Sequence, residues 1–484
     1  GFSFIYSGNF RIQAEVDTHD ITRITVGINP DGFDWELEPG ESFQTPEAVM
    51  VYSDNGLNEM SQTFHKLYAK RLARGYWRDR SRPILNNNWE ATYFDFTEDR
   101  LVKIAKKAKE CGIELFVLDD GWFGNRRSDR AGLGDWIVNK KLLPNGIEGL
   151  AERIEELGMQ FGLWIEPEMI NKDSNLYRQH PDWILQTPGR TDSHGRYQYV
   201  LDFSRREIVD YIYTMIAKIL SEAKISYIKW DMNRSITECY SIAYPAERQG
   251  EIFHRYILGV YDLYERLTSE FPKVLFESCA SGGGRFDPGM LYYAPQGWTS
   301  DDSDAIERLK IQYGTSMCYP ISSMGSHVSV IPNHQVFRNT PLHTRANVAY
   351  FGTFGYELDL NKLSDSEIEE VKAQILQFGT FYRLKSPFEG NETIWMVVNE
   401  EKTTALVGYY RVLNGVNMPY SRIKLQGLDP DKLYKNVLAN TESYGDELMN
   451  LGLITTDVTA GQVSGDAKPC TDFESRIYIL QEKS

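Results

Sequence analysis

Residues 227–234 read YIKWDMNR, a short apolar strand pattern that ends in an acid among polar and cationic residues. Because alternate residues of a strand share a face, Lys229 is expected to point the same way as Asp231. A neighbouring cation favours the ionised form of a carboxyl group, and Arg234 supplies a second one. The stretch therefore predicts a charged carboxylate aimed from the end of a strand.

Five further apolar runs in the same part of the chain end in acids or small polar groups. The residues placed there are Asp119, Asp120, Glu166, Glu168, Asp202, Glu277, Cys279, Asp301 and Asp302. Amphipathic helices separate these runs, and one of them starts after Thr97 and stops at Gly112. Alternating strands and helices over about 250 residues predict a parallel sheet, most simply a closed (β/α)8 barrel. In such a barrel the C-terminal ends of the strands build the active site.

The same patterns divide the chain into three predicted domains. Residues 1–55 alternate apolar and polar positions and predict a few antiparallel strands. Residues 56–385 carry the predicted barrel. Residues 386–484 contain short strand patterns separated by turn residues, which indicate an antiparallel β-sandwich. The predicted fold class is therefore α/β, with β-structure on both sides of the barrel.

The composition excludes several classes of protein. Hydrophobic residues make up 42% of the 484 positions, and no apolar run approaches the length of about 18 residues that a membrane span needs. A formal charge of −16 argues against nucleic acid and anionic membranes as partners. The cysteines are odd in number and scattered, which favours a reducing compartment over a disulfide framework. They are Cys111, Cys239, Cys279, Cys318 and Cys470.

Six motifs follow one another along the chain. They are NNWEATYF (87–94), LDDGWFG (118–124), GLWIEPEM (162–169), KWDMNR (229–234), ESCASGGGRFDPGM (277–290) and WTSDDSDAIERLKIQYG (298–314). In this order they resemble the motifs of the bacterial α-galactosidases of glycoside hydrolase family 36. The resemblance implies a retaining exo-α-galactosidase that removes terminal α-linked galactose from oligosaccharides of the raffinose and melibiose type. It implies a covalent galactosyl-enzyme, no cofactor and no metal.

The resemblance also implies roles for individual residues. Asp231 matches the catalytic nucleophile and Asp301 the general acid/base, although Asp302 and Asp304 stand close enough in the motif to be alternatives. The residues matching substrate ligands are Asp119, Asp120, Trp164, Lys229, Asn233, Cys279, Gly282, Trp89, Arg196 and Trp298. Trp164 resembles a platform under the sugar, Trp89 a stacking residue at the entrance, in the first barrel strand, and Cys279 with Gly282 a pair facing the 2-hydroxyl.

The chemistry of retaining hydrolysis agrees with two of these assignments. Such hydrolysis needs two carboxyl groups about 5 to 5.5 Å apart, one ionised to attack and one protonated to release the leaving oxygen. Strand ends around a barrel mouth can supply both. Taken singly, an acid after a strand is more often a helix cap or a loop residue. Trp89, Trp164 and Cys279 would each more often be packing residues.

Three alternatives stay open. The same scaffold fits an α-N-acetylgalactosaminidase or a galactosyl transglycosylase, although Cys279 and Gly282 would leave little room for an N-acetyl group at the 2-position. A metal-dependent barrel lyase would use Asp120, Glu166 and Asp202 as Mg²⁺ ligands and would lose activity to a chelator. A non-catalytic sugar-binding module is the weakest alternative, because Asp231 and Asp301 are both present.

The chain departs from the family in one respect. It begins at Gly1 without an initiator Met, within a strand pattern, so we expect most of the family's N-terminal β-domain to be absent. In the family that domain helps to form oligomers, commonly tetramers. The resemblance therefore implies a homo-oligomeric, cytoplasmic bacterial enzyme whose partner is a small oligosaccharide, with no nucleic acid and no membrane.

Overall fold

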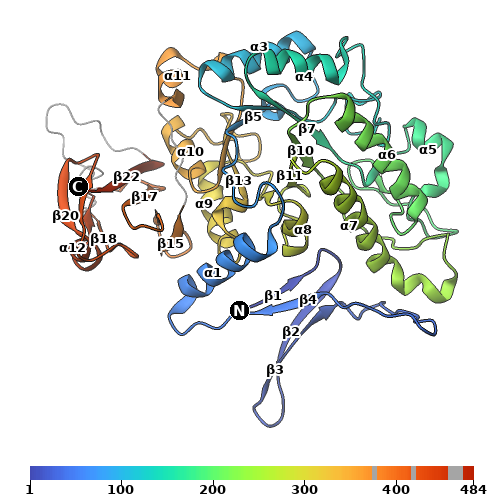
Figure 1. The fold of residues 1–484 in the computed structure, drawn as a ribbon, viewed down its shortest axis with the longest axis horizontal. Coiled ribbons are helices and arrows are strands. Elements are labelled where there is room, and N and C mark those ends of the chain that lie inside the picture. The colour runs from blue at the N-terminus through green and yellow to red at the C-terminus, as the bar shows by residue number, and fades with distance from the viewer. Residues whose placement is uncertain (373–378, 416–420, 456–471, 484) are drawn as a thin grey trace. The chain divides into compact units, whose positions relative to one another are not determined.

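The computed structural model describes residues 1–372, 379–415, 421–455 and 472–483 (Figure 1). Eight parallel strands form a closed barrel in the order β10-β11-β12-β13-β14-β5-β6-β7. Their bounds are β5 (Leu85–Asn87), β6 (Leu115–Leu118), β7 (Gln160–Ile165), β10 (Tyr227–Trp230), β11 (Leu275–Ser278), β12 (Gln296–Trp298), β13 (Met324–Ser329) and β14 (Thr353–Glu357). The predicted (β/α)8 barrel is confirmed.

Helices alternate with the barrel strands. In α3 (Glu98–Glu110) the Thr97 side chain caps the first turn, a buried face packs inward, and Gly112 follows in the left-handed region with φ 89°. The other α-helices are α1 (Gly56–Leu67), α2 (Trp89–Thr92), α4 (Gly146–Glu156), α5 (Asn175–Gln179), α6 (Arg206–Glu222), α7 (Ile252–Glu270), α8 (Pro288–Tyr293), α9 (Ala305–Thr315), α10 (Leu342–Ala349), α11 (Asp365–Lys372) and α12 (Gly445–Asn450). Thr97 and Gly112 thus bound their helix as the sequence predicts.

The barrel interior is filled by side chains of unequal size. Leu85, Leu115, Val117, Tyr227 and Leu275 form one buried apolar cluster. Gly162 of β7 makes room for it, since a Cβ there would lie 2.8 Å from the Tyr227 ring. This filled interior leaves the loops after the strands as the place for chemistry.

One predicted barrel strand lies elsewhere. The run that ends in Asp202 forms β9 (Gln198–Val200), which pairs antiparallel with β8 (Met169–Asn171) in a separate two-stranded sheet. Glu277 also differs from expectation, because it lies inside β11 rather than after it. The apolar run before Asp202 carried no information on which sheet it would join, so its assignment to the barrel was wrong.

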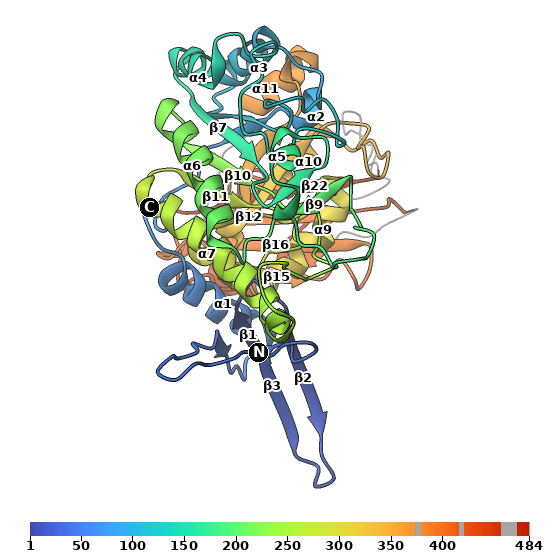
Figure 2. The ribbon, with the colours of Figure 1, turned by 90° about the vertical axis from the view of Figure 1, so that its right-hand side faces the viewer.

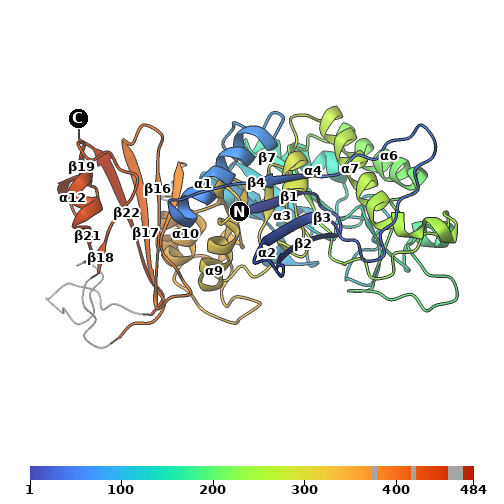
Figure 3. The same cartoon turned by 90° about the horizontal axis from the view of Figure 1, so that it is seen from below.

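Antiparallel strands make up the remaining sheets. Near the N-terminus β1 (Phe2–Ile5) pairs with β4 (Glu47–Met50), and β2 (Phe10–Val16) pairs with β3 (Thr22–Ile28) in a long hairpin, seen in Figure 2. Towards the C-terminus a six-stranded sheet has the order β15-β16-β17-β22-β19-β20, and β18 pairs with β21; Figure 3 shows β16, β17, β22 and β19 in sequence across it. The bounds are β15 (Thr380–Lys385), β16 (Glu392–Val398), β17 (Thr404–Arg411), β18 (Arg422–Ile423), β19 (Leu433–Asn436), β20 (Thr441–Tyr444), β21 (Leu453–Ile454) and β22 (Glu474–Glu482).

The chain divides into two compact units. The first comprises residues 1–52, 68–301 and 359–361, and the second comprises 53–67, 302–358 and 362–484. Four cysteines in the described residues are free thiols, and Cys470 lies outside those residues. None of the helices in the described ranges is long and apolar enough to cross a membrane.

Candidate active site

The Asp231 carboxylate, immediately after β10, accepts hydrogen bonds from four N–H donors. Its Oδ2 accepts from Trp164 Nε1 at 3.2 Å and from Asn233 Nδ2 at 2.7 Å. Its Oδ1 accepts from the backbone N–H of Met232 at 2.9 Å and of Ser281 at 3.3 Å. The side chain is nearly buried, with 7% of the residue exposed. Donors on both oxygens fix the direction of this carboxylate.

The two cations expected beside Asp231 have partners of their own. Lys229 Nζ lies 2.9 Å from Asp119 Oδ2 in a buried ion pair. Arg234 Nη2 donates to the Ser193 carbonyl at 2.9 Å and pairs with Glu238 at 3.3 Å. The sequence therefore predicted cations beside Asp231 and missed the uncharged donors that surround it.

The paired acids after β6 are held in two different ways. Asp119 Oδ2 accepts from Lys229 Nζ and, at 2.6 Å, from Asn87 Nδ2 at the end of β5. Asp120 faces the fully buried Arg126, whose Nε and Nη2 donate to both carboxylate oxygens at 2.8 to 3.2 Å. Burial raises the pKa of the Asp120 carboxyl, and the Arg126 charge opposes that rise. Sequence reasoning missed Arg126, which lies in the loop just after the LDDGWFG motif.

The loop after β11 packs against both Asp231, through Ser281, and Asp301, through Gly282. Burial first, and then the Asp231 and Asp301 carboxylates, raise the pKa of the Cys279 thiol well above its usual range, so this thiol stays protonated beside both acids. Gly282, with φ 87°, packs so closely that a Cβ would lie 2.5 Å from Ser300 Cα and 2.6 Å from Asp301 N. Only glycine fits this approach.

Asp301 follows β12 and is partly exposed. Its Oδ1 accepts a hydrogen bond from Trp298 Nε1 at 3.1 Å. Asp304, one of the alternatives to Asp301 in the motif, is the N-cap of α9 and accepts from the backbone N–H of Ile306 and Glu307. Asp304 thus has a structural task of its own, which favours Asp301 as the acid that serves the site.

The aromatic and basic ligands predicted from the resemblance lie in different settings. Trp164, within β7, is buried and donates to Asp231 while its ring stacks on Phe123 at a centroid distance of 6.3 Å. Trp89 begins α2 instead of lying in the first barrel strand, and its ring meets Phe94 edge-on. Arg196 is exposed in the loop before β9, with its Nη2 3.5 Å from Asp129.

The two acids after β7 belong to buried polar networks. Glu166 accepts from Gln198 Nε2 at 3.1 Å and from the backbone N–H of Asn233. Burial, and next the charge of Asp231, raise the pKa of Glu166 to about 8. Glu168 is instead gripped by Arg285, at 2.7 and 2.9 Å. The sequence did not predict these contacts of Glu166 and Glu168.

The ligand set of the metal-dependent alternative is not assembled. Asp120 pairs with Arg126, and Asp202 accepts from the hydroxyls of Ser204 and Ser241. Across the described part of the chain, no three His, Cys, Asp or Glu side chains come together in a group that could hold a metal ion. The carboxyl groups of Asp120 and Asp202 thus form ion pairs and hydrogen bonds within the protein.

These features define a (β/α)8 barrel with carboxylates held at the C-terminal ends of its strands. Comparison with known sequence families then gives three matches along the chain. The Melibiase family matches residues 42–385, the glycosyl hydrolase family 36 N-terminal domain matches 1–38, and the family 36 C-terminal domain matches 392–480. The chain belongs to the melibiase family, within glycosyl hydrolase family 36.

Individual relatives agree with that membership. Alpha-galactosidase AgaA of Geobacillus stearothermophilus is 59% identical over 463 residues, covering 94% of this chain and 63% of that protein. Alpha-galactosidase Mel36A of Lactobacillus acidophilus is 52% identical over 461 residues, covering 93% and 63%. A solved structure of an AgaA variant in complex with raffinose superposes with a TM-score of 0.96 at 56% identity, covering 100% of this chain and 67% of the other. The chain thus spans about 63% of the length of these two relatives.

Proposed function

We propose that the protein is a retaining exo-α-galactosidase that hydrolyses terminal α-linked galactose from oligosaccharides of the raffinose and melibiose type. The observation that carries the proposal is the Asp231 carboxylate, nearly buried, directed by four N–H donors and sharing the Cys279 thiol as a neighbour with Asp301. The relatives are named as α-galactosidases, and AgaA variants have been solved with raffinose and with stachyose.

In this proposal Asp231 is the nucleophile and Asp301 the acid/base. An Asp231 oxygen attacks the anomeric carbon while Asp301 gives its proton to the leaving oxygen, so the glycosidic bond breaks and a galactosyl ester forms on Asp231. Asp301, now ionised, takes a proton from water as that water attacks the anomeric carbon. Galactose leaves, the Asp231 carboxylate is restored, and Asp301 is protonated again.

The remaining residues select the sugar. Asp119, Asp120 and Lys229 form a buried polar group after β6 and in β10 that suits the hydroxyls of galactose, and Trp164 and Trp298 add aromatic surface and direct the two acids. The further ligands proposed are Trp89, Arg196, Asn233, Cys279 and Gly282. Gly282 is so tightly packed against Ser300 that this wall has little freedom to yield to a 2-acetamido group.

We also propose the division into residues 1–55, 56–385 and 386–484 as N-terminal β-structure, catalytic barrel and C-terminal β-domain. Homo-oligomerisation and a cytoplasmic location stay predictions from the family resemblance. Size-exclusion chromatography with light scattering would test the first of these.

The deciding assay is release of 4-nitrophenol from 4-nitrophenyl α-galactoside by the 484-residue chain. Turnover that withstands EDTA, with much weaker turnover of the α-N-acetylgalactosaminide and the α-glucoside, is the expected result. Added acceptor sugar separates hydrolysis from transglycosylation. Absence of turnover on the galactoside, in a protein that is folded by circular dichroism, would refute the proposal, and turnover that is lost with EDTA would indicate a metal-dependent reaction.

A further inference from the structure

Ser281, three residues after the end of β11, adopts a backbone conformation that serine rarely takes. Its φ of 47° lies in the left-handed region, and the three residues that follow it are glycines. A non-glycine residue held in this region costs on the order of 1 kcal/mol or more, which glycine avoids. A serine kept at such a position, beside glycines, indicates that its side chain has a task.

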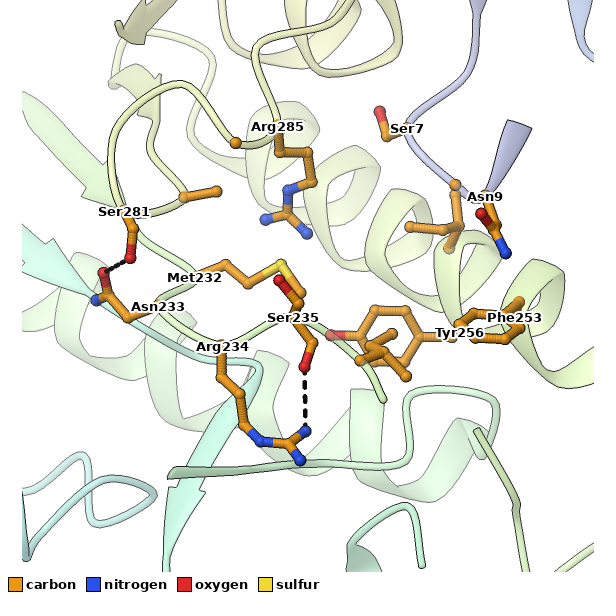
Figure 4. A pocket seen from close by; sticks show the side chains of 15 residues that line it. Ser7, Asn9, Met232, Asn233, Arg234, Ser235, Phe253, Tyr256, Ser281 and Arg285 are labelled. Carbon is orange, nitrogen blue, oxygen red and sulfur yellow. Dashed lines mark hydrogen bonds between the residues drawn. The ribbon is translucent and has the colours of Figure 1, made fainter. Parts of the chain in front are cut away.

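The two polar groups of Ser281 are linked to the two oxygens of the Asp231 carboxylate, one directly and one through Asn233. Its backbone N–H donates to Oδ1 at 3.3 Å. Its hydroxyl donates to Asn233 Oδ1 at 2.8 Å, and Asn233 Nδ2 in turn donates to Asp231 Oδ2 at 2.7 Å. Figure 4 shows the link between the Ser281 hydroxyl and the Asn233 amide. The result is a directional chain from hydroxyl to amide to carboxylate.

These two hydrogen bonds matter because the Asn233 side-chain amide could otherwise rotate. Both Ser281 and Asn233 line a cavity of about 410 Å³, together with residues of α7, Arg285 and the segment 7–9 (Figure 4). Turning the amide by half a revolution would place its carbonyl oxygen, an acceptor, against the Asp231 carboxylate, which only accepts. By donating to Asn233 Oδ1, the Ser281 hydroxyl therefore selects the amide orientation in which the Asn233 NH₂ group faces Asp231.

We propose that Ser281 is a positioning residue for the Asp231 nucleophile, acting through the Asn233 amide. This inference rests on the proposed glycosidase function. The amide donor holds one oxygen of Asp231 while the other forms and later breaks the bond to the anomeric carbon. Losing the hydroxyl leaves the substrate ligands other than Asn233 in place, so the expected defect is larger in turnover than in sugar binding.

The Ser281→Gly variant tests the role of the hydroxyl separately from that of the backbone. Glycine keeps the backbone N–H that bonds Asp231 and suits a φ of 47°, so thermal stability should be unchanged or higher. We expect kcat on 4-nitrophenyl α-galactoside to fall about tenfold, the effect of losing one hydrogen bond of about 1.4 kcal/mol, with KM and the Kd for galactose within about twofold.

Two further variants sharpen the test. Ser281→Thr retains a hydroxyl at the same position and should recover part of the lost kcat. Ser235→Ala removes a hydroxyl from another exposed serine that lines the same cavity, and should leave kcat unchanged. A Ser281→Gly enzyme with wild-type kcat overturns the proposal, as does a loss of kcat accompanied by an equal loss of galactose affinity. If the wild-type protein itself is inactive, it is the proposed function that has failed.

Discussion

Asp231 and Asp120 both follow barrel strands and are almost equally buried, yet the two carboxylates are held by opposite means. Asp231 accepts from uncharged N–H donors of Trp164, Asn233 and the backbone. Asp120 is locked onto the buried guanidinium of Arg126. Uncharged donors orient a carboxylate and leave its charge available for a reacting carbon, whereas an ion pair neutralises that charge. The difference separates an acid suited to attack from one suited to bind and hold.

The largest expected effect comes from breaking the Asp231 side of this comparison. Asp231→Ala should lower kcat on 4-nitrophenyl α-galactoside by at least about 1,000-fold, because in the proposed mechanism the covalent intermediate forms on Asp231. The donors around it are neutral, so no buried charge is left unpaired and the melting temperature should change by only a few degrees. Calorimetry beside the activity assay checks both parts. Activity within tenfold of wild type would remove Asp231 from the nucleophile's role.

Substitution of Asp120 should instead lower the stability of the protein. Asp120→Asn leaves the Arg126 charge buried without its counter-ion, and breaking a buried pair in this way costs about 3 to 5 kcal/mol. Urea unfolding monitored by fluorescence measures the loss. The double variant Asp120→Asn with Arg126→Met removes both charges and should recover most of it. A single variant as stable as the wild type would show that the ion pair contributes nothing to the fold.

The barrel could be predicted from the sequence because the signals for its strands and helices lie between residues close together in the chain. Apolar runs, caps such as Thr97 and stops such as Gly112 depend on neighbours in the chain, and the structure confirms both the barrel and that helix. The position of Asp231 at a strand end followed from the same pattern. The separate β8–β9 sheet, in contrast, depends on which strand finds a partner, and periodicity does not encode partners.

The contacts within the site were less predictable, for physical reasons. Arg126 and Asp120 are six residues apart, but their pairing depends on the path of the loop between them. Ser281 reaches Asn233 across 48 positions because its backbone adopts a left-handed turn. Trp164 serves as a donor to Asp231 as well as an aromatic surface, a role that only the orientation of its ring reveals. Family resemblance predicted the residues of the site, and the structure supplied what these residues contact.

Glu166 adds a third environment to the comparison, because the Arg126 charge and the Asn233 backbone N–H do not offset its burial and the charge of Asp231. Burial and the nearby Asp231 raise its pKa to about 8, so the folded protein keeps Glu166 protonated where the unfolded chain has lost that proton. Between pH of about 4.5 and 8 the folded state therefore binds more protons than the unfolded state, and stability should fall as the pH rises through this window. Above a pH of about 8 Glu166 is charged in both states, and the full free-energy cost of its burial lowers the stability of the folded state.

Glu166→Gln removes this titration and keeps a neutral group of the same shape. The Oε1 atom of Gln198 is buried without a hydrogen-bond partner, so that amide can turn to accept from the new NH₂ group, as it could from protonated Glu166. Relative to wild type, the variant should gain stability by about 1 to 3 kcal/mol between pH 5 and pH 8.5. Urea unfolding at the two pH values measures this gain. A difference between the two proteins that does not change with pH would mean that Glu166 is charged at neutral pH. Its contacts with Gln198 and the Asn233 backbone would then suffice to hold that charge.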